Sequence, residues 1–228
     1  MGPFAWPKWE AMFGDFSLFL RGLGYTFVIA IAALALSLVL GIIFGLMSEV
    51  PFKPLRVISR IYVEFFQNTP LLIQVIFLYN GLPLMGIMLS VTTIGILGVA
   101  LYHGAYITEV VRAGIGSVSR GQREAGLSQG FTYTQVMLEI ILPQAIRVML
   151  PPLTNQAVNL IKNTSVVAII NGADIMFTAK SWSGYNAYYG PAFVAAGLLY
   201  FILCFPLAKL ATHLEGKSQS TQEGGANG

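Results

Sequence analysis

An uncharged stretch of 26 residues, from Gly22 to Met47, is too long and too apolar for the surface of a soluble domain. About 20 consecutive apolar residues cross the hydrocarbon core of a bilayer as a helix, and a longer run spans it with tilt. Gly41 and Gly45 form a small-xxx-small pair, which either lets a neighbouring helix approach closely or simply faces lipid. The stretch predicts a transmembrane helix.

Four further apolar segments predict an all-α integral membrane protein with five transmembrane helices. Of the 228 residues, 55% are hydrophobic and 10% are charged, whereas a soluble domain carries about 25% charged residues. The predicted spans are 22–47, 58–82, 85–111, 145–168 and 192–214, all within a transmembrane domain of residues 21–215.

Three segments outside the spans have their own character. Residues 1–20 place Trp6 and Trp9 beside charged residues, which predicts an external segment lying on the membrane surface. Residues 171–191 are rich in tyrosine and glycine and predict an outer loop. Residues 216–228 contain few hydrophobic side chains and predict a disordered cytoplasmic tail. Pro206 is expected to kink the fifth span.

The distribution of lysine and arginine predicts the orientation in the membrane. With the N-terminus outside and the C-terminus in the cytoplasm, nine of these residues fall on the inner side, three fall on the outer side, and Lys162 lies in the membrane. Cytoplasmic loops carry the excess of positive charge in membrane proteins. The loop of residues 119–143, between the third and fourth spans, is therefore predicted to be cytoplasmic.

Helix start and stop signals divide this loop into two short helices. Ser119 with Gln122 is a capping-box pattern, with Glu124 near the positive end of the helix that it opens. Gly130 ends that helix, because glycine adopts positive φ at little cost. Thr132 with Gln135 repeats the capping box and opens a helix through Leu142. Pro143 then predicts a kink or a stop.

The loop also carries a spaced motif, made by Glu124-Ala125-Gly126, Gly130, Ile140 and Leu142-Pro143. This spacing resembles the EAA motif of importer-type ABC permeases, in which EAA, three residues, G, nine residues, I, one residue and LP follow in order. The match departs only at Gly126, where the family motif has its second alanine, and both residues are small. Residues 112–115, 150–156 and 159–165 resemble the polar amino acid subfamily, which includes histidine, glutamine, glutamate and arginine permeases. The resemblance covers roughly residues 22–215.

The resemblance implies the type I ABC importer permease fold, with cytoplasmic coupling helices. It implies a bacterial cytoplasmic (inner) membrane subunit that translocates polar amino acids and is not itself an enzyme. ATP and Mg would bind a separate cytoplasmic ABC ATPase dimer, with no cofactor on this chain. Other implied partners are a second permease subunit, identical or paralogous, and an extracytoplasmic amino acid-binding protein or domain. The residues implied to couple to the ATPase are Glu124, Ala125, Gly126, Gly130, Ile140, Leu142 and Pro143.

Polar side chains at membrane depth are the candidates for a substrate pathway, because they are costly unless they face the bundle interior or water. The candidates are Glu64, Asn68, Thr69, Gln74, Tyr102, Tyr106, Asn155, Asn159, Lys162 and Thr164. Lys162 either pairs with a substrate carboxylate or forms a salt bridge or snorkels to an interface. Glu64 or Glu109 could form an ion pair with a cationic side chain of the substrate. Alternatively, Glu64 lies near the cytoplasmic interface. Basic, acidic and amide substrates all remain open.

Other function classes find less support. Cys204 is the single cysteine, and the two histidines are far apart, so neither a disulfide nor a metal site is predicted. A net charge of +3 without a basic cluster argues against nucleic-acid binding. A stand-alone secondary transporter could relay protons through Glu64, His103, Glu109 and Lys162. That alternative leaves the cytoplasmic loop unexplained, and no inverted repeat between the two halves supports it. A structural or assembly membrane protein would need no polar fourth span.

Overall fold

The computed structural model describes residues 2–226, and for residues 215 and 217–226 it describes the backbone alone. The elements are α1 (Trp6–Gly14), α2 (Phe16–Glu49), α3 (Lys53–Gln67), α4 (Leu71–Leu84), α5 (Val91–Gly116), α6 (Arg120–Ser128), α7 (Tyr133–Gln135), η1 (Val136–Ile141), α8 (Leu142–Asn163), η2 (Thr164–Ile170), α9 (Ile175–Asn186) and α10 (Tyr189–Ala226). In the described residues four helical stretches are long and apolar enough to cross a membrane, and the bent pair α3–α4 adds a fifth. The prediction of an all-α membrane protein is confirmed.

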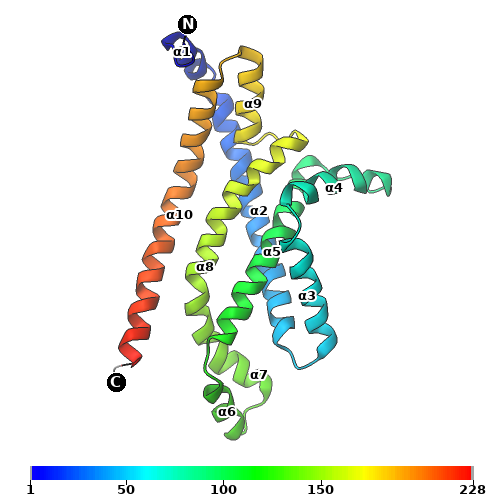
Figure 1. Cartoon of the computed structure of the whole chain (residues 1–228), viewed down its shortest axis with the longest axis vertical. Coiled ribbons are helices and arrows are strands. Elements are labelled where there is room, and N and C mark those ends of the chain that lie inside the picture. The colour runs from blue at the N-terminus through cyan, green and yellow to red at the C-terminus, as the bar shows by residue number, and fades with distance from the viewer. Residues whose placement is uncertain (1, 227–228) are drawn as a thin grey trace.

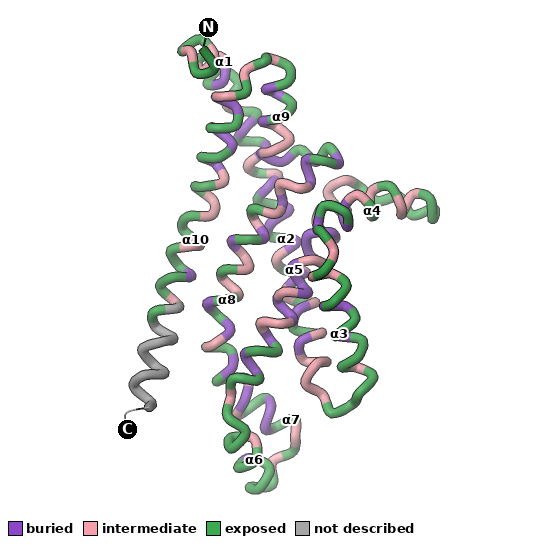
Figure 2. The backbone as a smooth tube through the Cα atoms, in the orientation of Figure 1, coloured by how far each residue is buried: buried purple, intermediate pink, exposed green. Residues whose placement is uncertain are grey.

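The long helices run side by side, with α1 and α9 at one end of the bundle and α6 and α7 at the other (Figure 1). Buried residues concentrate where α2, α5 and α8 face one another, whereas α4 and most of α10 are exposed or half-buried (Figure 2). Exposed large apolar side chains such as Phe27, Ile61, Phe77 and Phe201 cover the outer surface. A helix surface of this kind suits lipid.

Helices α2 and α5 pack closely through glycine. A Cβ on Gly41 would lie 2.2 Å from Cγ2 of Ile107, and a Cβ on Gly45 would lie 2.5 Å from Cγ1 of Val111. Cβ atoms do not approach other atoms this closely, so the absence of a side chain sets the distance between the two helices. Gly41 and Gly45 therefore contact a neighbouring helix, as the first of their two interpretations predicts.

The second span is not one helix over residues 58–82, as the sequence predicts. Helices α3 and α4 are bent by 99° at residues 68–70. Pro70 lacks a backbone N–H and disfavours helix at Thr69, so the helix ends there. The side chain of Asn68 donates to the carbonyl of Glu64 (2.7 Å), and that of Thr69 donates to the carbonyl of Phe65 (2.8 Å). These side-chain bonds cap carbonyls of the last turn of α3, where the helix ends.

The third span begins at Val91 rather than at residue 85, because Ser90 caps it by accepting from the N–H of Thr93 (3.1 Å). Residues 171–191 are not a simple loop but contain helix α9. Asp174 starts α9 by accepting from the N–H groups of Phe177 (2.9 Å) and Met176 (3.3 Å). Burial raises the pKa of the Asp174 carboxyl above its usual range, against the lowering effect of these bonds.

Two polar contacts hold α9 to the other elements at its end of the bundle. The indole N–H of Trp182 donates to Oδ2 of Asp15 (2.8 Å), which joins α9 to the segment between α1 and α2. The hydroxyl of Tyr200 on α10 donates to Oδ2 of Asp174 (3.0 Å). Helix α2 begins at Phe16, within residues 1–20, and the placement of those residues on the external membrane surface stays a prediction.

The fourth span is longer than predicted. Helical structure runs without interruption from Tyr133 to Ile170, and Pro143 lies in the first turn of α8 instead of stopping the helix. The π-helical turn η1 directly precedes it. A π turn widens the backbone ring and accommodates a proline whose missing N–H and bulky ring an α-helix would not tolerate.

The fifth span is the apolar part of α10, Tyr189–Leu214, with Pro206 inside one continuous helix. The backbone remains helical to Ala226, whereas the sequence predicts a disordered tail from residue 216. Extending an existing helix avoids the cost of nucleation, and no proline interrupts residues 207–226. Residues 227–228 lie outside the described residues.

Candidate functional site

The predicted coupling motif forms a compact unit at one end of the bundle (Figure 1). Gly126 is buried, and a Cβ placed on it would lie 2.8 Å from Cδ1 of Ile140 and 2.9 Å from Cγ2 of Val136. Two residues of the motif, Gly126 and Ile140, therefore pack directly against each other. Glu124 and Ala125 lie on the exposed side of α6. The motif thus separates into a packing face and an outward face.

Gly130 ends α6 as the sequence predicts, with φ at 88°. Its N–H donates to the carbonyl of Leu127 (3.0 Å), and the N–H of Phe131 donates to the carbonyl of Gly126 (3.2 Å). This is the Schellman arrangement, in which a left-handed residue closes a helix. The capping box of Thr132 and Gln135 is present. The one predicted at Ser119 is absent, because the Ser119 side chain makes no capping bond and only its carbonyl accepts from the N–H of Gln122.

The unit is joined to the end of α2 and to α5. The hydroxyl of Tyr133 donates to the carbonyl of Glu49 (3.0 Å), and Arg123 Nη2 lies 3.9 Å from Oε2 of Glu49. A buried apolar cluster then continues from the unit into the membrane. Its members are Ile107, Val111, Ile115, Val136, Met137, Ile141, Ala145 and Met149. Because packed interiors transmit displacement, movement of α6 and η1 would be felt by α5 and α8.

A second candidate region is a polar cavity of about 410 Å³ between α5 and α8. Its lining residues are Tyr102, His103, Tyr106, Gln156, Asn159, Lys162 and Asn163. Among these described residues Lys162 supplies the one formal cation, and no carboxylate is present. The amide groups and tyrosine hydroxyls donate and accept hydrogen bonds. The cavity therefore suits a small polar molecule with an anionic group.

Hydrogen bonds fix the orientation of His103, which is 1% exposed. Its Nδ1 lies 3.3 Å from Oε1 of Gln156, and its Nε2 lies 3.0 Å from Nδ2 of Asn163. An amide N–H of Asn163 donates to Nε2, so the proton resides on Nδ1 and donates to Gln156. The hydroxyls of Tyr102 and Tyr106 lie 3.1 Å apart. The cavity wall thus holds two hydrogen-bonded groups, the tyrosine pair on α5 and the His103 group that joins α5 to α8.

The structure brings together four of the sequence-predicted pathway residues, namely Tyr102, Tyr106, Asn159 and Lys162. Asn155 is exposed on α8 and is not among the lining residues. Thr164 is buried, and its hydroxyl donates to the carbonyl of Ile161 (2.7 Å). Gln74 donates to the carbonyls of Phe66 (3.0 Å) and Thr69 (2.9 Å).

Asn68, Thr69 and Gln74 therefore all bond to the backbone of the α3–α4 bend. Glu64 pairs with Arg60, with Arg60 Nε and Glu64 Oε1 2.6 Å apart. It lines a different cavity, between α2, α3 and α5.

Several residues of the two regions are absent from the sequence-based prediction. Gln156 and Asn163 complete the polar cavity. Gln156 lies three residues before Asn159, and Asn163 directly follows Lys162. His103 enters the sequence-based interpretation only in the alternative of a proton-driven transporter, and not among the residues of the predicted substrate pathway. Leu127, 46% exposed on α6, adds an apolar side chain to the outward face of the coupling unit. Its exposure follows from the burial of Gly126, which only packing reveals.

Comparisons with known proteins agree with this arrangement. Residues 37–219 match the family described as binding-protein-dependent transport system inner membrane component. The chain is 40% identical over 210 residues to a probable glutamine ABC transporter permease protein, GlnM, of Bacillus subtilis, covering 92% of this chain and 97% of that one. It is 31% identical over 202 residues to the arginine transport system permease protein ArtQ of Bacillus subtilis, covering 88% and 92%.

Among solved structures, the chain resembles an amino acid ABC transporter crystallised with histidines. The TM-score is 0.85 at 31% identity, over 92% of this chain and 98% of that one. A methionine ABC transporter in an inward-facing conformation, MetNI, has the same fold, with a TM-score of 0.71 at 15% identity over 88% of this chain.

The fold, with its apolar helices and the packed unit at one end of the bundle, defines a multi-pass membrane permease subunit. The chain belongs to the family of inner membrane components of binding-protein-dependent transport systems.

Proposed function

We propose that this chain is the permease subunit of an ATP-binding cassette importer that carries polar amino acids across the cytoplasmic membrane. The observation that carries the proposal is the coupling unit. Gly126 seats α6 against η1, so that Glu124, Ala125 and Leu127 face outward at one end of the bundle. An outward face that is backed by a continuous packed cluster suits a contact that transmits force.

The partner at this face is a cytoplasmic ABC ATPase dimer, which supplies the ATP and Mg sites that this chain lacks the motifs to form. The N-terminus is outside and the C-terminus is in the cytoplasm, with nine lysine and arginine residues on the inner side against three outside. A second permease subunit, identical or paralogous, completes the pathway, and an extracytoplasmic binding protein or domain delivers the substrate. The names of the relatives, which concern glutamine and arginine, support an amino acid as the substrate.

Co-purification with the ATPase subunit encoded alongside this chain tests the proposal. We expect the wild-type chain to bind the ATPase and to stimulate ATP hydrolysis in lipid. The variant combining Glu124→Arg with Gly130→Pro should lose both, because it reverses the charge of the outward face and removes the positive φ that closes α6. A chain that binds no ATPase and still moves amino acids under an ion gradient alone would instead be a secondary transporter.

The polar cavity is the proposed substrate-binding site. Lys162 would pair with the α-carboxylate, while Asn159 and the tyrosine hydroxyls would bond to the remaining polar groups. We expect Lys162→Ala to weaken substrate binding about tenfold or more, the scale of one lost charged hydrogen bond. Binding to the purified complex by calorimetry would measure the change.

Thr154→Ala is the control for this test. Its hydroxyl donates to the carbonyl of Leu150 in its own helix (2.9 Å), and Thr154 is not among the residues that line the cavity. Thr154→Ala should therefore leave the affinity unchanged. If Asn159→Ala and Lys162→Ala also bind substrate with wild-type affinity, the cavity is not the binding site.

A further inference from the structure

A second polar cavity, of about 380 Å³, lies between α2, α3 and α5. Its lining residues are Ser48, Arg56, Ser59, Arg60, Val63, Glu64, Glu109 and Arg112. All but Val63 are polar, and five carry a formal charge. A cavity with this lining is filled by water or by a polar solute, because charges exposed to hydrocarbon are strongly disfavoured.

The charged wall of α3 is separated from its apolar wall. Arg56, Arg60 and Glu64 recur at intervals of four residues and share one helix face. Ile61 and Phe65, exposed at 62% and 59%, lie on a different face that suits lipid. A third face is buried through Ser59, whose hydroxyl donates to the carbonyl of Phe44 (2.7 Å), and through Tyr62, whose hydroxyl donates to the carbonyl of Leu101 (2.8 Å). The packing therefore sets the charged face of α3 beside Glu109 and Arg112 of α5, where it lines the cavity, with the side chains of Arg60 and Glu64 79% and 58% exposed.

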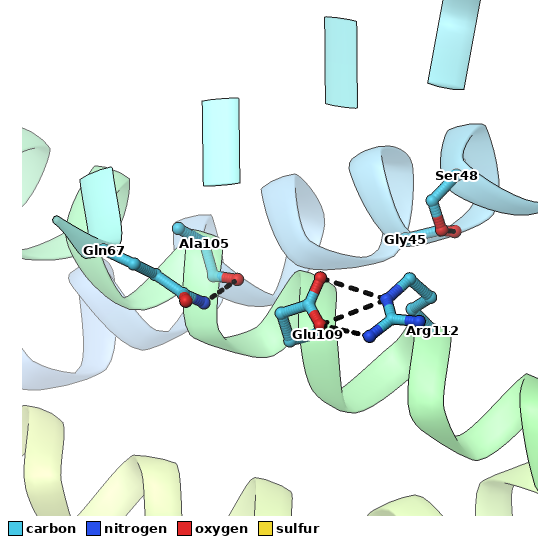
Figure 3. Close-up of polar contacts among 6 residues, drawn as sticks. All are labelled: Gly45, Ser48, Gln67, Ala105, Glu109 and Arg112. Carbon is cyan, nitrogen blue, oxygen red and sulfur yellow. Dashed lines mark hydrogen bonds and ion pairs between the residues drawn. The ribbon is translucent and has the colours of Figure 1, made fainter. Parts of the chain in front are cut away.

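Helix α5 connects this cavity to the candidate substrate site. Tyr102, Tyr106 and Glu109 follow one another at intervals of four and three residues, so they share one helix face. The two tyrosines line the first cavity and Glu109 lines the second. Figure 3 shows Glu109 and Arg112 facing each other on α5, with Gln67 bonded to the carbonyl of Ala105 (3.2 Å) one turn away. One polar face thus leads from the substrate cavity to the end of α5 nearer the coupling unit.

Two exposed ion pairs supply both signs of charge. The Arg112 guanidinium donates to both oxygens of Glu109, with the shortest contact at 2.6 Å, and Arg60 contacts Glu64 at 2.6 Å. Exposed pairs of this kind contribute little to stability and exchange partners readily. An amino acid zwitterion carries one ammonium and one carboxylate. Its ammonium can pair with the glutamate and its carboxylate with the arginine while the amino acid passes.

We propose that this second cavity is the cytoplasmic exit vestibule of the solute path, where the Glu109–Arg112 and Arg60–Glu64 pairs transiently bind an amino acid zwitterion. The inference rests on the proposed function, since it takes an amino acid as the solute and places this end of the bundle in the cytoplasm. Arg112 and Glu109 then act on the solute after it leaves Lys162.

Thiol labelling tests water access without any transport measurement. In a Cys204→Ala background, Glu109→Cys in inside-out membrane vesicles should react with a membrane-impermeant, charged thiol reagent. Ile61→Cys, on the lipid-facing side of α3, should not react. If Glu109→Cys stays unlabelled, or if both react equally, the vestibule does not exist as described.

Transport by the reconstituted complex tests the role of the charges. We expect the double variant Glu109→Gln with Arg112→Gln to lower amino acid uptake per ATP hydrolysed about fivefold, the size of one exposed ion pair's interaction. Assembly with the ATPase and the melting temperature should stay at wild-type values, and Lys209→Gln on α10 serves as the control. Unchanged uptake per ATP would overturn the inference, and so would loss of ATPase assembly, which would assign the pair to coupling. A wild-type complex that imports no amino acid would instead refute the proposed function.

Discussion

Replacing Gly126 by leucine should uncouple this chain from its ATPase while leaving the membrane bundle folded. A Cβ at residue 126 already lies 2.8 Å from Ile140 and 2.9 Å from Val136, and leucine adds three further carbon atoms to the same buried space. Val136 is 1% exposed and β-branched, so it has little freedom to move aside. Helix α6 must therefore leave η1, and its outward face loses its position. We expect ATPase stimulation to fall at least about tenfold, an effect of about 1.4 kcal/mol or more.

Gly121→Leu is a matched control within the same helix. A Cβ on Gly121 meets nothing within 4 Å, and both substitutions raise helix propensity equally. Gly121→Leu should stimulate the ATPase as the wild-type chain does. Stimulated ATP hydrolysis and co-purification, measured on both variants in lipid, decide the question. Equal activity of the two variants would mean that seating α6 on η1 is not needed for coupling.

The long apolar helices are predictable from sequence because the membrane thickness sets their length and apolar character. The bend between α3 and α4 was missed because its determinants are tertiary in part. Pro70 signals a break, but the same sequence also fits a kinked span. The bend is defined by side-chain bonds from Asn68, Thr69 and Gln74 to the backbone. Those bonds also explain why polar residues at this depth are present without lining either polar cavity.

Helix α9 was missed for a related reason. Its sequence is short and lies in a segment, residues 171–191, whose tyrosine and glycine content favours a loop, but Asp174 caps it and Trp182 is buried. The bonds from Trp182 to Asp15 and from Tyr200 to Asp174 join residues far apart in the chain. Local propensity does not contain such contacts, so tertiary packing decided the structure here.

The coupling motif was predictable because its turn signals are local. Gly130 requires a left-handed backbone, and Thr132 with Gln135 forms a local capping box. The polar cavity was predicted only in part. The spacing of Tyr102 and Tyr106 and that of Asn159 and Lys162 identify two helix faces, but which helices meet is a tertiary property. Gln156 and Asn163 enter the cavity because His103 of α5 lies between them.

Substituting valine for Gly41 should strongly destabilise the bundle, because this glycine sets the approach of α2 to α5. A Cβ there would lie 2.2 Å from Cγ2, 2.6 Å from Cβ and 3.1 Å from the backbone carbonyl carbon of Ile107. Ile107 is fully buried, its Cβ lies within the clash distance whatever its rotamer, and its carbonyl carbon makes a further tight contact, so rotation of the side chain gives no full relief. The helices must separate and lose packing along the central interface. Overpacking of a core typically costs about 1–3 kcal/mol, which for a chain of this size is about 2–12 °C in melting temperature.

Gly24→Val separates this clash from the general effect of a β-branched residue in a helix. Gly24 lies in the same helix α2, and a Cβ on it meets nothing within 4 Å. Thermal unfolding of the detergent-solubilised chains should show Gly41→Val melting well below both the wild type and Gly24→Val. If Gly41→Val and Gly24→Val have the same melting temperature, close contact at Gly41 does not set the distance between α2 and α5. A second-site change of Ile107 to alanine removes the contacting Cγ2 and should restore part of the loss only if the two helices meet as described.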